Sequence, residues 1–297
     1  MDMKVSEILA RNKKTLSIEV FPPKTSDSFE KVRIATENIA AIAPAYMSVT
    51  YGAGGTGSKF TLPIAENIEK KYNVPVIHHL TCVGSSVENI KERLDLMHSA
   101  GIENVLALRG DIPEGEMPEN WHFKHASDLV SYIKNYGDFC IGGACYPEGH
   151  PEADSIDSDL DFLKLKVDMG CDFLTTQLFL DNSVFYRFYE KALAKGINVP
   201  ITAGIMPITS IKQFGRIESL SGSAIPHTMR CCAEKYADDP VAMRRFGLDF
   251  ATLQIADLYN HGFKFIHLYS MNSPEAAIEI GTTLSNYFGA ELFSGKL

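Results

Sequence analysis

Short apolar runs rich in β-branched residues alternate with longer segments of helical period along almost the whole chain. The runs have the length of buried strands, and the segments between them place apolar residues three or four positions apart, as amphipathic helices do. The predicted strands are Ser17–Phe21, Tyr46–Tyr51, Val74–Thr81, Asn104–Leu108, Phe139–Cys145, Phe173–Phe179, Ile201–Ile205 and Lys264–Tyr269. Strands separated by helices indicate a parallel sheet with helical crossovers.

The predicted helices lie in the intervals between these strands. They are Ser28–Ala41, Thr61–Lys71, Ser86–Ser99, Ala126–Asn135, Asp157–Met169, Ser183–Lys195, Ile211–Glu218, Val241–Asn260 and Ser273–Tyr287, with a short helix near Val5–Arg11. Ser273 suits a helix N-cap, and Pro274 suits the first helical turn. The stretch Ser221–Pro240 is predicted to be an irregular insertion.

Eight strand–helix units predict a closed (β/α)8 TIM barrel rather than an open sheet. No Pro/Gly/Ser-rich linker and no close internal repeat divides the chain. We therefore expect an α/β fold in which residues 1–297 form a single barrel domain with an extra N-terminal helix.

Composition and charge narrow the function classes. The chain is 45% hydrophobic, which excludes a disordered protein, and its formal net charge of −9 argues against a nucleic-acid partner. Its six cysteines form no Cys-x-x-Cys pair, Met1–Glu19 contains no apolar signal segment, and no apolar run approaches the ~20 residues that span a bilayer. These features predict a cytoplasmic protein without a membrane partner.

Polar residues occur at the ends of most predicted strands. In a TIM barrel the carboxyl ends of the strands surround the active site. These ends carry Glu19, Thr50, His79, Arg109–Asp111, Tyr146, Gln177 and Tyr269. Strand ends also meet water, which accounts for some of these positions but poorly for Glu19 within an apolar strand. The pattern therefore predicts one shared pocket.

Three simpler kinds of site are disfavoured. Gly52–Gly57 matches G-x-G-x-x-G, but the next strand ends in His-His-Leu-Thr rather than in an acid that could bind a ribose, so we expect a barrel loop and not a Rossmann turn. Ser58-Lys59 reverses the order of a P-loop. His78 and His79 are neighbours on a strand and point to opposite faces, and His150 is distant in sequence, so no metal site is predicted.

Three motifs together are highly specific. They are E-x-F-P-P-K at 19–24, L-R-G-D at 108–111 and Y-P-E-x-H-P-E-A at 146–153. In this order and spacing the chain resembles the flavin-dependent 5,10-methylenetetrahydrofolate reductases, from about Val5 to Phe288. The resemblance implies a barrel that binds FAD non-covalently, takes hydride from NADH or NADPH and reduces 5,10-methylenetetrahydrofolate to 5-methyltetrahydrofolate.

The resemblance assigns Glu19 as the general acid that protonates the departing folate nitrogen. Since Ile18, Val20 and Phe21 flank it, we expect its pKa to be raised, so that the carboxyl stays protonated near neutral pH. The alternative is a buried structural carboxylate paired with a lysine.

The other roles implied by the resemblance concern binding. Asp111 would contact both the folate ring and the flavin (the alternative being a turn or N-cap residue), Gln177 would orient folate and nicotinamide in turn, and Gln213 and Tyr269 would complete the substrate site. The positions that match FAD contacts are Thr50, Tyr51, Ala53, His79, Arg109, Gly110, Asp111, Ala126, Tyr146, His150, Asp159 and Lys166. Arg109 and Lys166 suit the diphosphate or a ribose because phosphate attracts cations. A solvated lysine is the alternative for Lys166.

Four residues depart from the pattern of better-known bacterial members. Phe162 and Leu165 stand in place of Asn and Arg, Ile217 in place of a Phe over the nicotinamide site, and Ser273 in place of an Arg that reaches the folate tail. We therefore expect FAD to be held more by packing, and either weaker peripheral binding or a different electron donor such as a partner protein.

Other functions stay open on the residues alone. One is a different FAD-binding barrel, such as a proline dehydrogenase, and another is a non-catalytic barrel that binds folate or a partner. A homo-oligomer is expected by analogy with the bacterial members, and the choice between NADH and NADPH is undecided.

Overall fold

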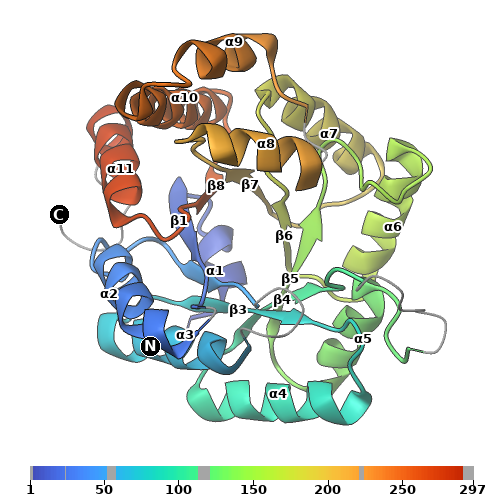
Figure 1. The fold of residues 1–297 in the computed structure, drawn as a ribbon. Helices are drawn as coiled ribbons and strands as arrows, with labels where there is room; N and C mark the ends of the chain where they lie inside the picture. The colour runs from blue at the N-terminus through green and yellow to red at the C-terminus, as the bar shows by residue number, and fades with distance from the viewer. Residues whose placement is uncertain (1–2, 24, 52–57, 113–120, 221–223, 290–297) are drawn as a thin grey trace.

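The strands pair in chain order and close into a parallel barrel, β1 to β8, with β8 returning to β1 (Figure 1). This computed structural model describes residues 3–23, 25–51, 58–112, 121–220 and 224–289. The strands are β1 Thr15–Val20, β2 Met47–Val49, β3 Val76–Thr81, β4 Asn104–Leu108, β5 Cys140–Cys145, β6 Phe173–Thr176, β7 Ile201–Ile205 and β8 Phe265–Tyr269. The predicted TIM barrel is confirmed, although β2 and β6 are shorter than expected.

Helices surround the barrel, and the short α1 lies near one end of it (Figure 1). The helices are α1 Val5–Ala10, α2 Phe29–Ala40, α3 Ser58–Tyr72, α4 Val87–Ala100, α5 Ala126–Tyr136, α6 Ile156–Asp168, α7 Asn182–Ala194, α8 Ile211–Leu220, α9 His227–Lys235, α10 Pro240–Asn260 and α11 Pro274–Phe288, with a 3-10 turn at Ser26–Ser28. Among the helices of these ranges, none is both long and apolar enough to cross a membrane.

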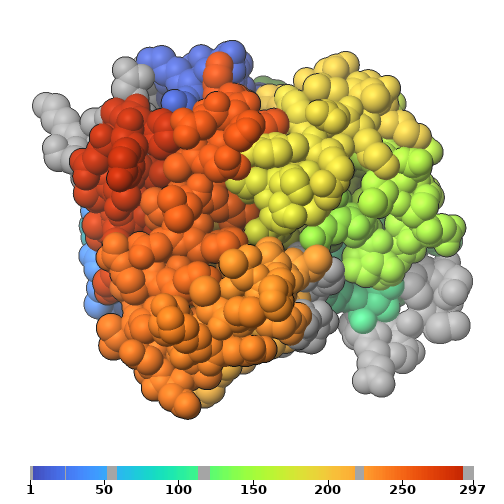
Figure 2. Space-filling model, turned by 90° about the horizontal axis from the view of Figure 1, so that it is seen from above, coloured from blue at the N-terminus to red at the C-terminus, as the bar shows by residue number. Residues whose placement is uncertain are grey.

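The prediction that Ser221–Pro240 is irregular was wrong, because α9 lies within it. This helix buries only Met229 and Ala233, one turn apart. Both residues belong to a separate apolar cluster with Ile208 and Met243. Two buried positions are too few to create a recognisable period, so tertiary packing stabilises α9. From above, α9 and α10 form one contiguous orange surface (Figure 2).

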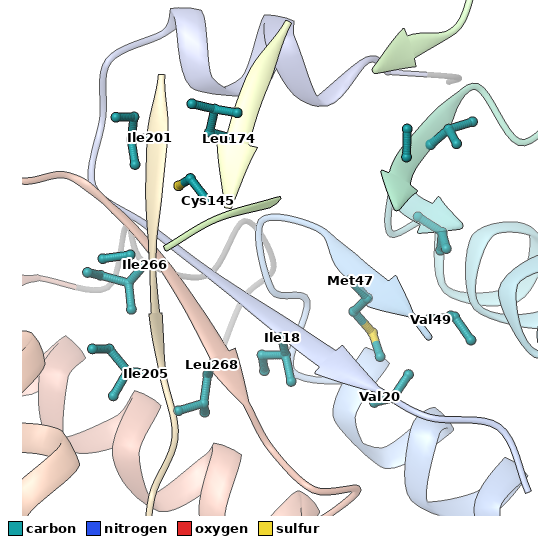
Figure 3. Packing of buried hydrophobic residues seen from close by; sticks show 14 of the residues in the cluster. Ile18, Val20, Met47, Val49, Cys145, Leu174, Ile201, Ile205, Ile266 and Leu268 are labelled. Atoms are coloured by element: carbon teal, nitrogen blue, oxygen red, sulfur yellow. The ribbon is translucent and has the colours of Figure 1, made fainter. Parts of the chain in front are cut away.

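The period of two along the strands separates two environments. On β1, Leu16, Ile18 and Val20 belong to the main apolar cluster, which the surrounding helices also line (Figure 3). The alternate residues Ser17 and Glu19 face the barrel interior, where Ser17 contacts His267 of β8. Because successive strand residues point to opposite faces, the polar positions gather inside the barrel.

The amino end of the barrel is closed by apolar packing. Val5, Ile8 and Leu9 of α1 cluster with strand residues such as Leu106 and Phe173. The backbone N–H of Val5 donates to Asn104 Oδ1 at 2.7 Å, which ties α1 to β4. The opposite, carboxyl end of the strands therefore carries the polar positions considered below.

Candidate active site

Glu19 lies on the inner wall of the barrel near the carboxyl end of β1. Ser48 Oγ, on β2, donates to Glu19 Oε2 at 3.4 Å. The Nε2 atoms of His79, on β3, and His267, on β8, lie 3.5 Å and 3.8 Å from the same oxygen. About 20% of the Glu19 side chain remains exposed. Neighbouring strands thus surround one partly accessible carboxylate with polar groups.

His267 is buried between two hydroxyl groups. Its Nδ1 lies 2.8 Å from Ser17 Oγ, and its Nε2 lies 3.0 Å from Ser48 Oγ. The ring also stacks on Tyr46, with centroids 6.0 Å apart. Neither His267 nor Ser48 was predicted from the sequence. The signal was available, since His267 shares the strand face of Tyr269, and Ser48 shares that of Thr50.

The expectation of a raised pKa for Glu19 was wrong. Burial does raise it, but the polar contacts with His267, His79 and Ser48 outweigh burial and hold the pKa below its usual range. The apolar neighbours in sequence, Ile18 and Val20, face the outer cluster and do not surround the carboxylate. Within the described residues the partners are histidines and a serine, not the lysine of the alternative.

His79 and Tyr51 present polar atoms that fit a ligand. His79 Nε2 and Tyr51 Oη are buried and have no hydrogen-bond partner among the described residues. Burial lowers the pKa of His79 to about 4, so its imidazole is neutral at neutral pH. Buried polar atoms normally have partners. Both residues are implied FAD contacts, and each has a buried polar atom with which a bound group could pair. The two atoms do not share one pocket, since Tyr51 lies beside His78 and His79 lies beside Glu19, on opposite faces of β3.

The two adjacent histidines lie on different faces of β3, as predicted. His79 approaches Glu19 at 3.5 Å, whereas the ring of His78 lies beside that of Tyr51, with centroids 6.4 Å apart. Within the described ranges, no three His, Cys, Asp or Glu side chains are grouped closely enough to hold a metal ion.

A cavity of about 370 Å³ lies between β4, β5, α5 and α6. This volume is within the usual range for small-molecule sites. The implied FAD contacts that line it are Arg109, Ala126, Tyr146, His150, Asp159 and Lys166. Phe162 and Leu165 also line it, with 65% and 43% of their surface exposed. Phe162 and Leu165, which stand in place of the Asn and Arg of better-known bacterial members, therefore form part of the cavity wall.

The remaining implied FAD contacts lie outside this lining. Thr50, Tyr51 and His79 are on or after β2 and β3, and Gly110 and Asp111 follow β4. Ala53 and the Gly52–Gly57 motif lie outside the described residues.

The loop after β5 holds several of the lining side chains in place. The His150 N–H donates to Asp159 Oδ2 at 3.2 Å, and the rings of Tyr146 and His150 meet edge to face with centroids 4.7 Å apart. Lys166 Nζ donates to the Ala144 carbonyl, so this amine is anchored on β5 rather than fully solvated. Burial raises the pKa of Asp159.

Gly110 is required by the turn that presents Asp111. Its φ of +89° is one that L-residues rarely adopt, and a Cβ there would lie 2.8 Å from Val83 Cγ1. Asp111 follows at an exposed position.

The implied substrate contacts are held by local hydrogen bonds. Gln177 Oε1 accepts the Leu178 N–H at 2.9 Å, Tyr269 Oη donates to the Thr176 carbonyl, and Gln213 Oε1 accepts the Thr209 N–H at 2.8 Å. These three side chains come from the ends of β6 and β8 and from the start of α8.

Two of the departures have structural roles. Ile217 is 3% exposed and belongs to the apolar cluster that includes α9. Ser273 caps α11 by accepting the Ala276 N–H at 3.2 Å, which confirms the predicted N-cap.

Comparisons with known proteins agree with the resemblance. The sequence model of the methylenetetrahydrofolate reductase family matches residues 4–285. Methylenetetrahydrofolate reductase (NADH) 1 of Arabidopsis thaliana is 38% identical over 291 residues, covering 93% of this chain and 49% of that protein. The chain thus spans about half the length of this plant relative.

Bacterial relatives are matched over most of their length. The 5,10-methylenetetrahydrofolate reductase of Escherichia coli strain K12 is 33% identical over 270 residues, covering 91% of this chain and 90% of that protein. An uncharacterized protein from Clostridium thermocellum that binds two copies of 5-methyl-5,6,7,8-tetrahydrofolic acid has the same fold, with a TM-score of 0.64 at 17% identity, covering 96% of this chain and 100% of that one. The chain belongs to the methylenetetrahydrofolate reductase family.

Proposed function

We propose that this protein is an FAD-dependent oxidoreductase that reduces 5,10-methylenetetrahydrofolate to 5-methyltetrahydrofolate with electrons from NADH or NADPH. The observation that carries the proposal is the partly exposed Glu19 carboxylate, which Ser48, His79 and His267 hold at the carboxyl end of the barrel. Membership of the family supports the same reaction. Because the Arabidopsis relative's name specifies NADH, NADH is the donor to test first.

The residues that would hold FAD form two groups. Arg109 and Lys166 supply positive charge, and Phe162 supplies an apolar surface, in the cavity between α5 and α6. Tyr51 Oη and His79 Nε2 are buried polar atoms without a hydrogen-bond partner among the described residues, and each could pair with a polar group of FAD. When bound, FAD would accept hydride from the nicotinamide and transfer it to the folate methylene carbon.

Glu19 would supply the proton that opens the folate five-membered ring. With its pKa held low, the carboxylate is ionised at neutral pH in the free protein. A ligand that covered the exposed 20% of the Glu19 side chain would remove further water from the carboxylate, and this loss of water favours its protonated form. Ser48 and His267 hold the carboxylate in position for this transfer.

Asp111 and Gln177 would orient the substrate. An exposed carboxylate after the Gly110 turn can accept hydrogen bonds from the donor edge of a pterin ring. The Gln177 amide keeps donor capacity while its oxygen accepts the Leu178 N–H. By analogy with bacterial members we expect a homo-oligomer. A partner protein as electron donor is the alternative to a nicotinamide.

Purified full-length protein tests the proposal. We expect a yellow protein with FAD bound, which forms 5-methyltetrahydrofolate from methylenetetrahydrofolate and NADH or NADPH. Bound FAD that is reduced by proline but not reoxidised by folate would favour the proline-dehydrogenase alternative. Folate binding without flavin or turnover would favour a non-catalytic barrel. Either result would refute the proposed function.

A further inference from the structure

Arg109, at the end of β4, makes a two-pronged ion pair with Glu152. Its Nη1 and Nη2 atoms donate to the two Glu152 carboxylate oxygens at 2.6 Å and 2.7 Å. Its Nε donates to the Gly110 carbonyl at 3.3 Å. The Arg109 side chain is 21% exposed and that of Glu152 is 58% exposed. Both residues line the cavity between α5 and α6.

The loop after β5 holds Glu152 in this position. The Glu152 N–H donates to His150 Nδ1 at 3.1 Å, and the next N–H, that of Ala153, donates to the His150 carbonyl at 2.9 Å. The hydrogen bond between the two side chains lowers the pKa of Glu152 and raises that of Arg109. Both groups therefore stay charged at neutral pH.

Among the residues that the structure describes, the ionisable side chains that line this cavity give it no excess of positive charge. Its permanent cations are Arg109 and Lys166, and its carboxylates are Asp128, Glu152 and Asp159. With all five ionised and its histidines neutral, two positive and three negative charges leave a formal charge of −1. Asp128 Oδ2 accepts hydrogen bonds from the backbone N–H groups of Lys124 and His125. Glu152 is the carboxylate in the lining that pairs with Arg109.

A phosphate and a carboxylate compete for the same donors. Guanidinium binds either group through a pair of parallel N–H bonds. A diphosphate that approached Arg109 would therefore have to displace Glu152 or share the cation with it, and would be repelled by its charge.

We propose that Glu152 is a built-in competitor that sets the affinity and selectivity of the Arg109 subsite for the anionic part of its ligand. The proposal rests on the proposed function, in which that ligand is the diphosphate of FAD. It predicts that removing the carboxylate charge strengthens binding of phosphate-bearing flavins and leaves riboflavin, which carries no phosphate, unaffected.

The test compares full-length wild-type protein with Glu152→Gln and a matched control, Asp161→Asn. Asp161 is an acidic residue of α6 that pairs with Lys195 and does not line the cavity, so its substitution changes net charge equally. Dissociation constants of FAD and riboflavin are measured by flavin fluorescence at low and at high NaCl.

Glu152→Gln should bind FAD about three- to tenfold more tightly at low salt, because one ion-pair competitor and one repulsive charge are removed. The gain should shrink at high salt, and riboflavin should bind wild type and variant equally. If Glu152→Gln bound FAD only as tightly as Asp161→Asn does, or more weakly than wild type, the proposal for Glu152 would be overturned while the proposed function would stand. The weaker value would mean that Glu152 orients Arg109. If FAD bound none of the three proteins, the proposed function would fail as well.

Discussion

Replacing Glu19 with Gln keeps the shape of the side chain and removes its charge. The structure predicts two effects, one on stability and one on a single half-reaction. The stability effect comes from the contacts at 3.4, 3.5 and 3.8 Å to Ser48, His79 and His267. These distances are at or beyond the long limit for hydrogen bonds, so together they stabilise the fold by about 1 kcal/mol rather than by that amount each.

The sign of the pH dependence follows from the lowered pKa of Glu19. A carboxyl whose folded pKa lies below its unfolded value adds stability above the unfolded value, about 4.3, and loses it as pH falls through the folded pKa. Glu19→Gln should therefore be about 1 kcal/mol less stable than wild type at pH 7. The difference should disappear in acid.

Urea unfolding at pH 7 and at acidic pH measures this difference. Glu190→Gln, at an exposed position of α7, controls for a general effect of charge. A Glu19→Gln protein that is more stable than wild type at pH 7 would refute the reasoning. It would mean that burial destabilises the ionised carboxylate more than its polar contacts stabilise it.

The Glu19→Gln variant also tests the role of Glu19 as the general acid. FAD binding and flavin reduction by the nicotinamide should change little, whereas reoxidation by methylenetetrahydrofolate should fall by ~10²–10⁴-fold, as expected for a lost general acid. Rapid-mixing absorbance of the flavin measures both steps. Reduction of methylenetetrahydrofolate by this variant at near the wild-type rate would show that Glu19 is not the general acid.

Three further substitutions test separate parts of the structure. Phe162→Ala should raise the Kd of FAD about tenfold and leave that of riboflavin, which lacks the adenosine end of FAD, unchanged. Met169→Ala, at the exposed C-cap of α6 outside the cavity lining, should change neither, and equal losses for both flavins would contradict a contact of Phe162 with the adenosine end. Gly110→Ala should lower the free energy of unfolding by about 2 kcal/mol or more, because its φ is positive and a Cβ there would crowd Val83. Gly101→Ala, with φ +88° but no neighbour within 4 Å, should lower the free energy of unfolding by only about 1 kcal/mol. Equal losses of stability in urea titrations would show that Val83 moves aside without cost. Asp111→Asn should raise the flavin midpoint potential and slow folate reduction roughly tenfold or more, because a charged hydrogen-bond acceptor is lost; an unchanged potential with proportional changes in both half-reactions would indicate a turn residue only.

The barrel could be predicted because its strands are encoded locally. Runs such as Asn104–Leu108 and Ile201–Ile205 are mostly apolar and coincide with β4 and β7. The prediction extended β6 to Phe179, but the strand ends at Thr176. The last pair in the β5–β6 ladder is Cys145 with Thr176, so pairing with the neighbouring strand sets this boundary. The helix α9 was missed because its few buried residues depend on contacts with distant segments.

The environment of Glu19 could not be inferred from its neighbours in sequence. Ile18 and Val20 point to the outer cluster, and the groups that set the pKa come from β2, β3 and β8, between 29 and 248 residues away. The pairing of Arg109 with Glu152 likewise joins the end of β4 to the loop after β5. Motif spacing identifies which residues gather at one end of the barrel, but not which of them contact one another.

The central claim is that this barrel passes electrons from a nicotinamide to methylenetetrahydrofolate through bound FAD. Anaerobic stopped-flow absorbance of the flavin in wild-type protein tests it most directly, with NADH or NADPH added first and methylenetetrahydrofolate second. We expect at least one nicotinamide to bleach the flavin, and methylenetetrahydrofolate then to reoxidise it with 5-methyltetrahydrofolate formed in equal amount. A flavin that is bleached but stays reduced when methylenetetrahydrofolate is added would contradict it.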